Sequence, residues 1–401
     1  MKQYCISDHC RFVKGAQGSA IYDLQHEKVY SINPAGTQYL TDALMGKALD
    51  EDAGCFLDKL EADGLLNDHS TQIVEHRIVP KLRYAWLELT SRCNCRCLHC
   101  YGAFGVPDKK EFESELSLDE WINVIDNIKK RGCNAIQFIG GEPLVHPHFT
   151  TLLKYAHDKG ISRIDIFTNA YLLNGQIADV IEQVGASVRV SLYGYDAHSH
   201  DAITQHPGSF EKLDHGIDLL KARNVPITIA VVLMRENQEI LPQIKEYIAH
   251  KGLRFTGFDT VRTVKHSVQE SHAVTDKELI GRRTISTPRF RTSAIRFATN
   301  HQWNSCWYGK FSVTAQGDII PCIFARDLVC GNIRTDDWDA IRDKLLSYWR
   351  ITKDDVEGCK DCEYRYACDD CRPLAMGDGD GLYGKYPRCT YLPSTCHWSE
   401  L

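Results

Sequence analysis

The sequence predicts an α/β fold built on a parallel sheet, flanked by a small N-terminal region and a cysteine-rich C-terminal region. Strand-like and helix-like segments alternate six times between residues 84 and 261. More than half of the 17 cysteines lie between 306 and 396, and another group follows the first strand-like segment. A chain of 401 residues is long enough for two or three domains, each with its own core.

Six segments rich in bulky and β-branched residues predict the strands: 84–90, 135–139, 164–168, 187–193, 227–234 and 254–261. Amphipathic patterns predict helices at 148–159, 174–184, 210–223 and 240–250. A further helix begins after Ser117, an N-cap candidate with Glu120 at the third helical position. Strands that alternate with helices predict parallel pairing through right-handed crossovers.

The loop after the first predicted strand carries Cys93, Cys97 and Cys100 in the spacing C-x3-C-x2-C. Three thiolates on one short loop can hold three corners of a [4Fe–4S] cube. Electron-transfer clusters are normally closed by four cysteines, so the fourth iron would take a ligand from elsewhere. The alternative is a zinc site, which Cys95 and His99 could complete with four protein ligands.

This spacing at a strand's end resembles the radical SAM superfamily. The resemblance implies that the central region is a (β/α)6 partial TIM barrel and that S-adenosylmethionine (SAM) chelates the open iron. It also implies reductive cleavage of SAM to a 5′-deoxyadenosyl radical that abstracts hydrogen from a substrate. His99 fits the aromatic position before the third cysteine, and Cys95 is not expected to bind the cluster.

Short motifs at the ends of later strands resemble the SAM-contacting positions of this superfamily. Gly140-Gly141-Glu142-Pro143 follows the second strand and resembles its "GGE" motif, whose glycines let the backbone approach a ligand. For the two glycines the alternative is a plain turn, and for Thr168 and Ser191 the alternative is an ordinary strand residue. The remaining positions to which the resemblance assigns SAM contacts are Thr168, Asn169, Ser191 and Leu233.

The C-terminal region carries seven cysteines in a second pattern, and a glycine at Gly317 lies between the first two. The pattern resembles the SPASM domain, a cysteine-rich extension of radical SAM enzymes that act on peptides and proteins. It departs at one point, because Cys368 and Cys371 are separated by two residues rather than three. The alternative is a zinc ribbon formed by Cys359, Cys362, Cys368 and Cys371.

Position by position, the SPASM resemblance implies two auxiliary [4Fe–4S] clusters. Cys359, Cys362, Cys368 and Cys389 would close the distal cluster, and Cys306, Cys322 and Cys371 would bind the proximal one. The stretch before Cys306 lacks the further cysteine of many relatives. The fourth proximal ligand is therefore left open, or is one of Cys330, His301 and Cys396.

The first eighty residues predict a winged-helix module, with two short strands at 20–32, a helix from Pro34 to about Met45, and a helix ended by Gly64. Seven Lys and Arg against twelve Asp and Glu give the wrong sign for DNA binding. The region resembles the RiPP recognition element, which captures a precursor's leader peptide as an added strand. A structural extension without a ligand is the alternative.

Cysteines outside any ligand spacing are expected to be small buried hydrophobic residues. They are Cys5, Cys10, Cys55 and Cys133.

Composition and charge indicate which cellular compartment and which binding partners are to be expected. A net charge of −6 argues against a general nucleic-acid or anionic-membrane binder, and no apolar run approaches a membrane span. The start of the sequence lacks the apolar core of a signal peptide. We therefore expect a cytoplasmic protein in which the cysteines bind metal clusters rather than form disulfides.

Together these features resemble the radical SAM/SPASM peptide maturases, with a weaker resemblance to those of grasp-with-spasm systems. The implied domains are 1–80 for peptide recognition, 81–262 for the radical SAM barrel, 263–305 as a bridge and 306–401 for SPASM. The implied reaction is a thioether, C–C or C–O crosslink in a ribosomally made precursor peptide, with electrons from a donor such as flavodoxin or ferredoxin.

Other functions remain open from sequence alone. One is modification of a protein side chain in the manner of anaerobic sulfatase maturases. Another, of a different class, is a non-enzymatic iron–sulfur electron carrier or a zinc-dependent interaction protein. No catalytic base is assigned, although Asp196, Tyr193 and Glu88 are candidates with structural roles as their simpler explanation.

Overall fold

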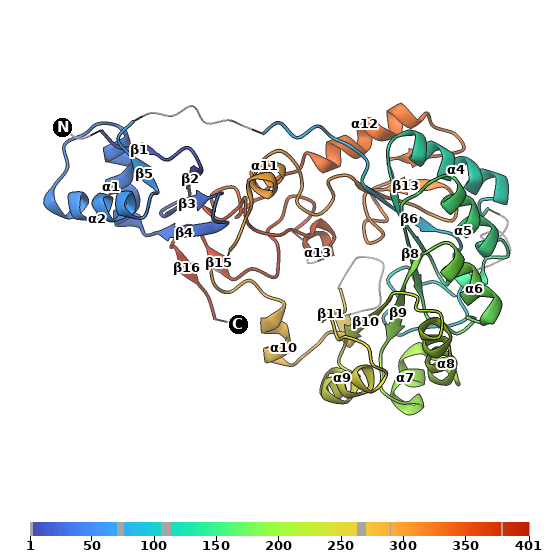
Figure 1. Ribbon diagram of the computed structural model, residues 1–401. Helices are drawn as coiled ribbons and strands as arrows, with labels where there is room; N and C mark the ends of the chain where they lie inside the picture. Colours follow the sequence, from blue (N-terminus) through green and yellow to red (C-terminus); the bar gives the residue numbers. More distant parts are fainter. Residues whose placement is uncertain are drawn as a thin grey trace. The chain divides into compact units, whose positions relative to one another are not determined.

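The computed structural model describes residues 3–69, 76–105, 114–262, 270–288, 290–377 and 380–400. Residues 70–75 of the predicted N-terminal domain, and 263–269 and 289 of the predicted bridge, lie outside this range. The chain forms two compact units (Figure 1). We call Pro80–Arg283 with Gly309–Tyr348 the sheet unit, and Met1–Val79 with Thr284–Tyr308 and Trp349–Leu401 the terminal unit.

The sheet unit is built on a nine-stranded sheet in the order β11-β10-β9-β8-β7-β6-β12-β13-β14. Its first six strands in the chain pair in parallel, as predicted. They are β6 (Tyr84–Glu88), β7 (Ala135–Ile139), β8 (Arg163–Thr168), β9 (Ser187–Leu192), β10 (Ile227–Leu233) and β11 (Phe258–Thr260). Long runs of buried residues in β7 and β9 fit a sheet that is covered on both faces.

Three further strands make the sheet mixed, which the sequence analysis did not predict. β12 (Lys310–Val313) pairs in parallel with β6, and β13 (Asp318–Ile320) and β14 (Gly331–Asn332) add antiparallel pairs. Gly317 has φ +90° in the β12–β13 turn, where its amide donates to the carbonyl of Thr314 at 2.9 Å. The glycine of the predicted SPASM pattern is therefore required by a tight hairpin.

Helices connect the parallel strands, as Figure 1 shows. α4 (Leu118–Lys130) begins with the predicted capping box, because Ser117 and Glu120 exchange hydrogen bonds with each other's backbone amides. The short α7 (Ala197–Thr204), capped by the Asp196 side chain, was not predicted. The other α-helices in the described part of this unit are α5 (Phe149–Asp158), α6 (Gly175–Gln183), α8 (Ser209–Lys221), α9 (Leu241–His250) and α10 (Lys277–Arg282), with α12 (Trp338–Trp349) at its boundary.

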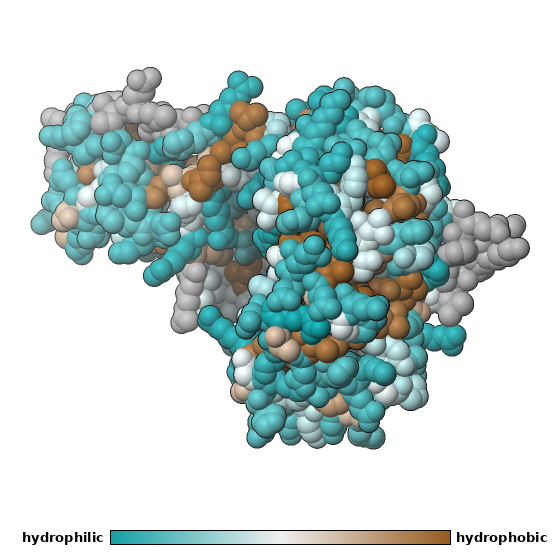
Figure 2. All heavy atoms as spheres, turned by 45° about the vertical axis from the view of Figure 1, so that its right-hand side comes forward, coloured by the Kyte–Doolittle hydropathy of each residue, from teal (hydrophilic) through white to brown (hydrophobic). Residues whose placement is uncertain are grey.

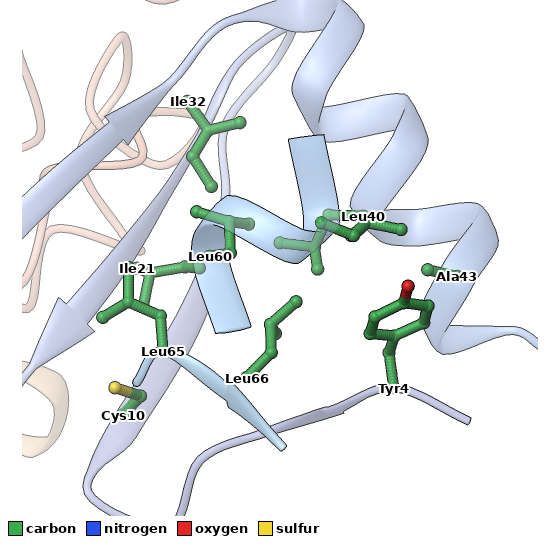
Figure 3. Close-up of a cluster of buried hydrophobic side chains, with 10 residues drawn as sticks. Tyr4, Cys10, Ile21, Ile32, Leu40, Ala43, Leu60, Leu65 and Leu66 are labelled. Atoms are coloured by element: carbon green, nitrogen blue, oxygen red, sulfur yellow. The ribbon is translucent and has the colours of Figure 1, made fainter. Parts of the chain in front are cut away.

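The terminal unit contains an antiparallel sheet of β2 (Cys10–Lys14), β3 (Ser19–Asp23) and β4 (Lys28–Ile32). All of β3 is buried, because alternate residues face two different cores. Ile21 packs with α1 (Pro34–Leu44) and α2 (Glu51–Ala62) in the cluster of Figure 3. Ala20 and Tyr22 pack instead with aromatic residues of the C-terminal segment.

The predicted end of α2 is confirmed. Gly64 has φ +74°, and the next amide, of Leu65, donates to the carbonyl of Leu60 at 2.9 Å, the hydrogen bond of a Schellman cap. Strand β2, which the sequence analysis missed, completes the small sheet. The remaining elements among the described residues of this unit are β1 (Cys5–Ile6), β5 (Leu66–Asn67), α11 (Ala294–Gln302), α13 (Arg372–Gly377), β15 (Tyr391–Leu392) and β16 (His397–Trp398).

The face of the molecule drawn in Figure 2 is mostly hydrophilic, with apolar side chains reaching the surface in scattered groups. Among the described residues, no helix is both long enough and apolar enough to span a bilayer.

Candidate active site and cluster sites

The three-cysteine loop leaves the carboxyl end of β6 and is fastened on both sides. The amide of Cys93 donates to the carbonyl of Gly105 at 2.8 Å. Farther along, the amides of Arg96 and Leu98 donate to carbonyls at the end of α7, at 2.9 and 3.0 Å. The loop therefore has its shape set by backbone hydrogen bonds at the end of the sheet where parallel α/β folds carry their chemistry.

The sulfur atoms of this loop suit an iron–sulfur cluster. The amide of Cys95 donates to Cys93 Sγ at 3.4 Å, and the amide of Phe104 donates to Cys100 Sγ at 3.3 Å. Burial raises the pKa of Cys100, and the nearby Cys93 raises it further. Thiolates crowded in this way need a bound cation, and hydrogen bonds to sulfur help to set a cluster's potential. The donor set therefore fits the expected cube.

The glycine pair after β7 packs directly on the start of the cysteine loop. A Cβ atom at Gly140 would lie 2.6 Å from the carbonyl oxygen of Thr90, and one at Gly141 would lie 2.2 Å from that of Arg92. The amides of Gly141 and Glu142 donate to these same two oxygens, at 2.8 and 2.9 Å. The pair therefore positions the loop, a role that the sequence analysis did not assign to it.

Glu142 ties the ends of β7 and β8 together. Its carboxylate is 1% exposed and accepts hydrogen bonds from the Thr168 hydroxyl at 2.6 Å and from the Asn169 amide at 2.8 Å. Burial raises the pKa of Glu142 to about 7. The predicted residue Pro143 begins the short helix η1 (Pro143–Val145), which the same carboxylate caps through the amide of Leu144.

Asn169 reaches from the end of β8 to the cysteine loop. Its amide nitrogen donates to Asn94 Oδ1 at 3.0 Å and to Cys95 Sγ at 3.6 Å. The structure therefore brings together four predicted cofactor positions, Gly141, Glu142, Thr168 and Asn169, beside the predicted cluster ligands.

The other side of the loop meets residues at the ends of β9 and β10. The rings of His99 and Tyr193 meet edge to face with centroids 4.4 Å apart. Cys97 packs against an apolar cluster that contains Tyr193 and Met234. The predicted residues Ser191 and Leu233 are buried at 5% and 0% exposure.

Asn237 is a polar residue of this region that the sequence analysis missed. It is completely buried, and its amide nitrogen donates to the carbonyls of Tyr193 at 2.9 Å and Val232 at 3.0 Å. Its side-chain oxygen accepts from the amide of Met234 at 2.7 Å. Asn237 therefore joins the ends of β9 and β10, and only its neighbourhood in space reveals this role.

The candidate bases have structural partners. Glu88 is 1% exposed and accepts a hydrogen bond from Arg326 Nη1 at 2.9 Å and another from the Tyr101 hydroxyl at 3.3 Å. Asp196 caps α7 through the amide of Ser199 at 2.8 Å. Both carboxylates are thus already engaged in holding the fold, which favours the structural explanation for them.

The terminal unit gathers the thiols assigned to the distal cluster. Cys359, Cys368 and Cys389 are close enough that charge on one raises the pKa of another. Lys353 is 4% exposed, with Nζ 3.9 Å from Cys359 Sγ and 3.2 Å from Asp370 Oδ1. A buried cation beside several thiols fits an anionic cluster bound there.

The residues assigned to the proximal cluster belong to different units. Cys306 and Cys371 lie in the terminal unit, and Cys322 and Cys330 lie in the sheet unit. Of the other proposed ligands, His301 packs edge to face with Tyr366, with centroids 4.8 Å apart. Cys396 lines a cavity of the terminal unit. The fourth proximal ligand therefore stays a prediction.

Two family models match the chain. The model of the radical SAM superfamily matches residues 87–248, and that of the SPASM iron–sulfur cluster-binding domain matches residues 306–363.

Two individual relatives and one solved structure are similar to the chain at low sequence identity. An AdoMet-dependent heme synthase of Methanosarcina barkeri is 26% identical over 77% of this chain and 96% of its own length. The subtilosin biosynthesis protein AlbA of Bacillus subtilis is 24% identical over 65% of this chain and 60% of its own length. The structure of Streptococcus suis SuiB bound to the precursor peptide SuiA superposes with a TM-score of 0.59 at 14% identity, over 98% of this chain and 100% of SuiB.

The two family matches and the relatives thus indicate an iron–sulfur enzyme that uses SAM. Residues 87–248 of the chain carry a radical SAM domain, and residues 306–363 carry a SPASM iron–sulfur cluster-binding domain. Its cofactors are a [4Fe–4S] cluster with SAM and auxiliary iron–sulfur clusters. The expected cofactors are therefore confirmed and the non-enzymatic alternative is wrong, whereas the residue assignments stay predictions.

Proposed function

We propose that this enzyme modifies a ribosomally made precursor peptide by forming a thioether, C–C or C–O crosslink. The proposal rests on two features of one chain: the radical SAM domain, and the outer edge of β4 in the terminal unit, with which no strand pairs among the described residues. The match to AlbA, a bacteriocin biosynthesis protein, and the likeness to peptide-bound SuiB support it.

When bound, the first cluster supplies the electron that cleaves SAM and yields the hydrogen-abstracting 5′-deoxyadenosyl radical. Cys93, Cys97 and Cys100 would hold that cluster. Asn169 and the Gly140-Gly141 turn would fix the shape of the loop and contact SAM. The packed side chains of Tyr193 and Met234 would keep water away from the reacting atoms.

The proposed docking site for the leader peptide is the outer edge of β4. In the described part of the chain, β4 pairs with β3 alone, so its other edge can accept an added strand. Strands β2–β4 followed by α1 and α2 support the predicted winged-helix-like recognition module.

A cavity of about 560 Å³ beside the end of β4 would supply specificity. Ile32 of β4, Tyr39 of α1 and Phe56 of α2 line one part of it, and Tyr391 and Trp398 line another. Apolar walls of this kind suit one or two large apolar side chains of an extended peptide. Main-chain hydrogen bonds along β4 would give affinity, and the cavity would fix the register.

A binding measurement tests the docking site. Fluorescence anisotropy of a labelled leader peptide from a small open reading frame beside this gene should show saturable binding to the reconstituted enzyme. Tyr39→Ala should weaken binding at least tenfold. Tyr383→Ala is the matched control, because Tyr383 is 51% exposed and is not among the residues that line the cavity. Equal affinities for the two variants would contradict the docking site.

Mass spectrometry of the co-expressed precursor tests the reaction. A crosslink removes two hydrogens, so the product should be about two mass units lighter. A mass that is unchanged after reaction in ordinary water, together with uptake of deuterium when the reaction is run in heavy water, would indicate epimerisation instead and would refute the crosslink.

Haem formation is a second candidate, favoured by the heme synthase that aligns over most of both chains. Formation of haem from an iron-containing tetrapyrrole, followed by absorbance, would support it against the peptide reaction. The electron donor, such as flavodoxin or ferredoxin, the cytoplasmic location and the four domain ranges stay predictions.

A further inference from the structure

Two turns at one end of the β2–β3 hairpin bring together four polar side chains and a thiol. One turn precedes β2, where the amide of Cys10 donates to the carbonyl of Ser7 at 2.8 Å. The other follows β3, where the amide of His26 donates to Asp23 Oδ1 at 3.0 Å. Cys10 and Asp23 are direct partners across the two strands, so the sheet register fixes their proximity.

The side chains present three different metal-binding atoms to one point. A ring nitrogen of His9, the sulfur of Cys10 and a carboxylate oxygen of Asp23 all lie within 4.8 Å of one another. His9 Nε2 lies 3.9 Å from Asp23 Oδ1. Ligands bound to one tetrahedral zinc ion, at about 2.0–2.3 Å each, lie only a little closer together than this.

Outer partners orient two of these ligands. His9 Nδ1 lies 3.2 Å from Asp8 Oδ1, which favours a proton on Nδ1 and leaves Nε2 with its lone pair toward Asp23. Asp23 Oδ2 accepts from His26 Nδ1 at 2.7 Å. A carboxylate behind a ligating histidine is the usual second layer of a protein metal site.

The burial of the group suits an ion rather than a salt-bridge cluster. Cys10 is completely buried, and the side chains of Asp23 and His9 are 3% and 26% exposed. A thiolate and a carboxylate together neutralise a divalent ion, so the occupied site carries no net charge. Figure 3 shows the Cys10 sulfur at the margin of the apolar cluster, pointing away from Leu66.

We propose that His9, Cys10 and Asp23 bind one zinc ion, with water in the fourth position and with Asp8 and His26 as outer partners. The ion would clamp the two turns of the recognition module and so stabilise the end of the sheet opposite β4's entry into α1. The expectation that Cys10 is only a core residue would then be wrong, because sequence spacing hides ligands that meet across strands. Zinc binding requires neither precursor nor turnover, so its outcome is independent of the proposed function.

Zinc analysis of the holoenzyme tests this site. The clusters are first reconstituted anaerobically so that their cysteines are occupied, and excess metal is removed before one equivalent of zinc is added. The wild-type enzyme should retain one zinc per chain that Cys10→Ser and His9→Gln do not retain. X-ray absorption at the zinc edge should show one sulfur at about 2.3 Å and nitrogen or oxygen ligands at about 2.0 Å.

Three variants make the test specific. Cys133→Ser changes a buried cysteine of the sheet unit and should leave zinc content unchanged. His9→Gln changes a partly exposed turn residue, so it keeps the test valid if Cys10→Ser fails to fold. Asp8→Asn should weaken zinc binding at least tenfold, since it removes only an outer partner. Equal zinc content in wild type and His9→Gln, or a site without sulfur, would overturn the proposal.

Discussion

Replacing Lys353 with methionine should lower the midpoint potential of the distal auxiliary cluster. Its ammonium is 4% exposed and lies 3.9 Å from Cys359 Sγ, with Asp370 as its anionic partner. Adding an electron to the cluster adds negative charge, which a nearby cation stabilises. Removing the cation therefore makes reduction harder.

The structure sets the size of this effect. A unit charge about 4 Å away contributes about 4 kcal/mol at an effective dielectric constant of about 20. The added electron is spread over the cube and lies farther away on average, so about 2 kcal/mol is expected. That energy corresponds to on the order of 80 mV for a one-electron couple, at about 59 mV per 1.4 kcal/mol.

Potentiometric titration followed by electron paramagnetic resonance measures the shift. Lys360→Met is the matched control, because Lys360 follows Cys359 in the chain but is exposed, so water screens its charge. The control should move the potential by much less than Lys353→Met. A potential in Lys353→Met within about 20 mV of the control, or a shift to higher values, would refute the reasoning.

Three further predictions concern substitutions at the strand ends of the sheet unit. Each is checked by measuring the free energy of unfolding in urea. Gly141→Ala should lower the free energy of unfolding by about 1–3 kcal/mol, because the new Cβ would lie 2.2 Å from the carbonyl oxygen of Arg92. Gly54→Ala is the control: a Cβ there has open space, so it should not lower the free energy of unfolding. Asn237→Ala should cost about 1–3 kcal/mol by leaving buried carbonyls unpaired, and a cost below about 0.5 kcal/mol would contradict its role. The pKa of Glu142 is about 7 in the folded protein and 4.5 in the unfolded chain. As the pH rises, the unfolded chain therefore loses this proton at a lower pH than the folded protein does. Stability should therefore fall as pH rises from about 5 to 7, and Glu142→Gln should flatten this dependence; equal slopes would refute it.

The regular part of the fold could be predicted because its local signals agree with one another. Ser117 and Glu120 form the capping box that their spacing indicates. The parallel strands show the apolar runs and helix alternation of a covered sheet. Gly64 ends α2 in the left-handed conformation that favours glycine there.

The missed features depend on contacts between residues far apart in sequence. β12 joins the sheet beside β6, a pairing that no local pattern in either strand reports. The Gly140-Gly141 pair fits against the carbonyls of Thr90 and Arg92, so its main packing role is visible only in space. Asn237 likewise has an ordinary local sequence, and its importance lies in the three backbone groups that surround it.

The central claim is that the three-cysteine loop holds the cluster that cleaves SAM. The most direct test measures the 5′-deoxyadenosine released by the anaerobically reconstituted, dithionite-reduced enzyme. The wild-type chain, loaded with about twelve iron for three cubes, should release 5′-deoxyadenosine from SAM. Cys97→Ala should abolish that release while retaining the auxiliary clusters, with about eight iron. No 5′-deoxyadenosine from the fully loaded wild type, or undiminished release by Cys97→Ala, would contradict the assignment of the three-cysteine loop.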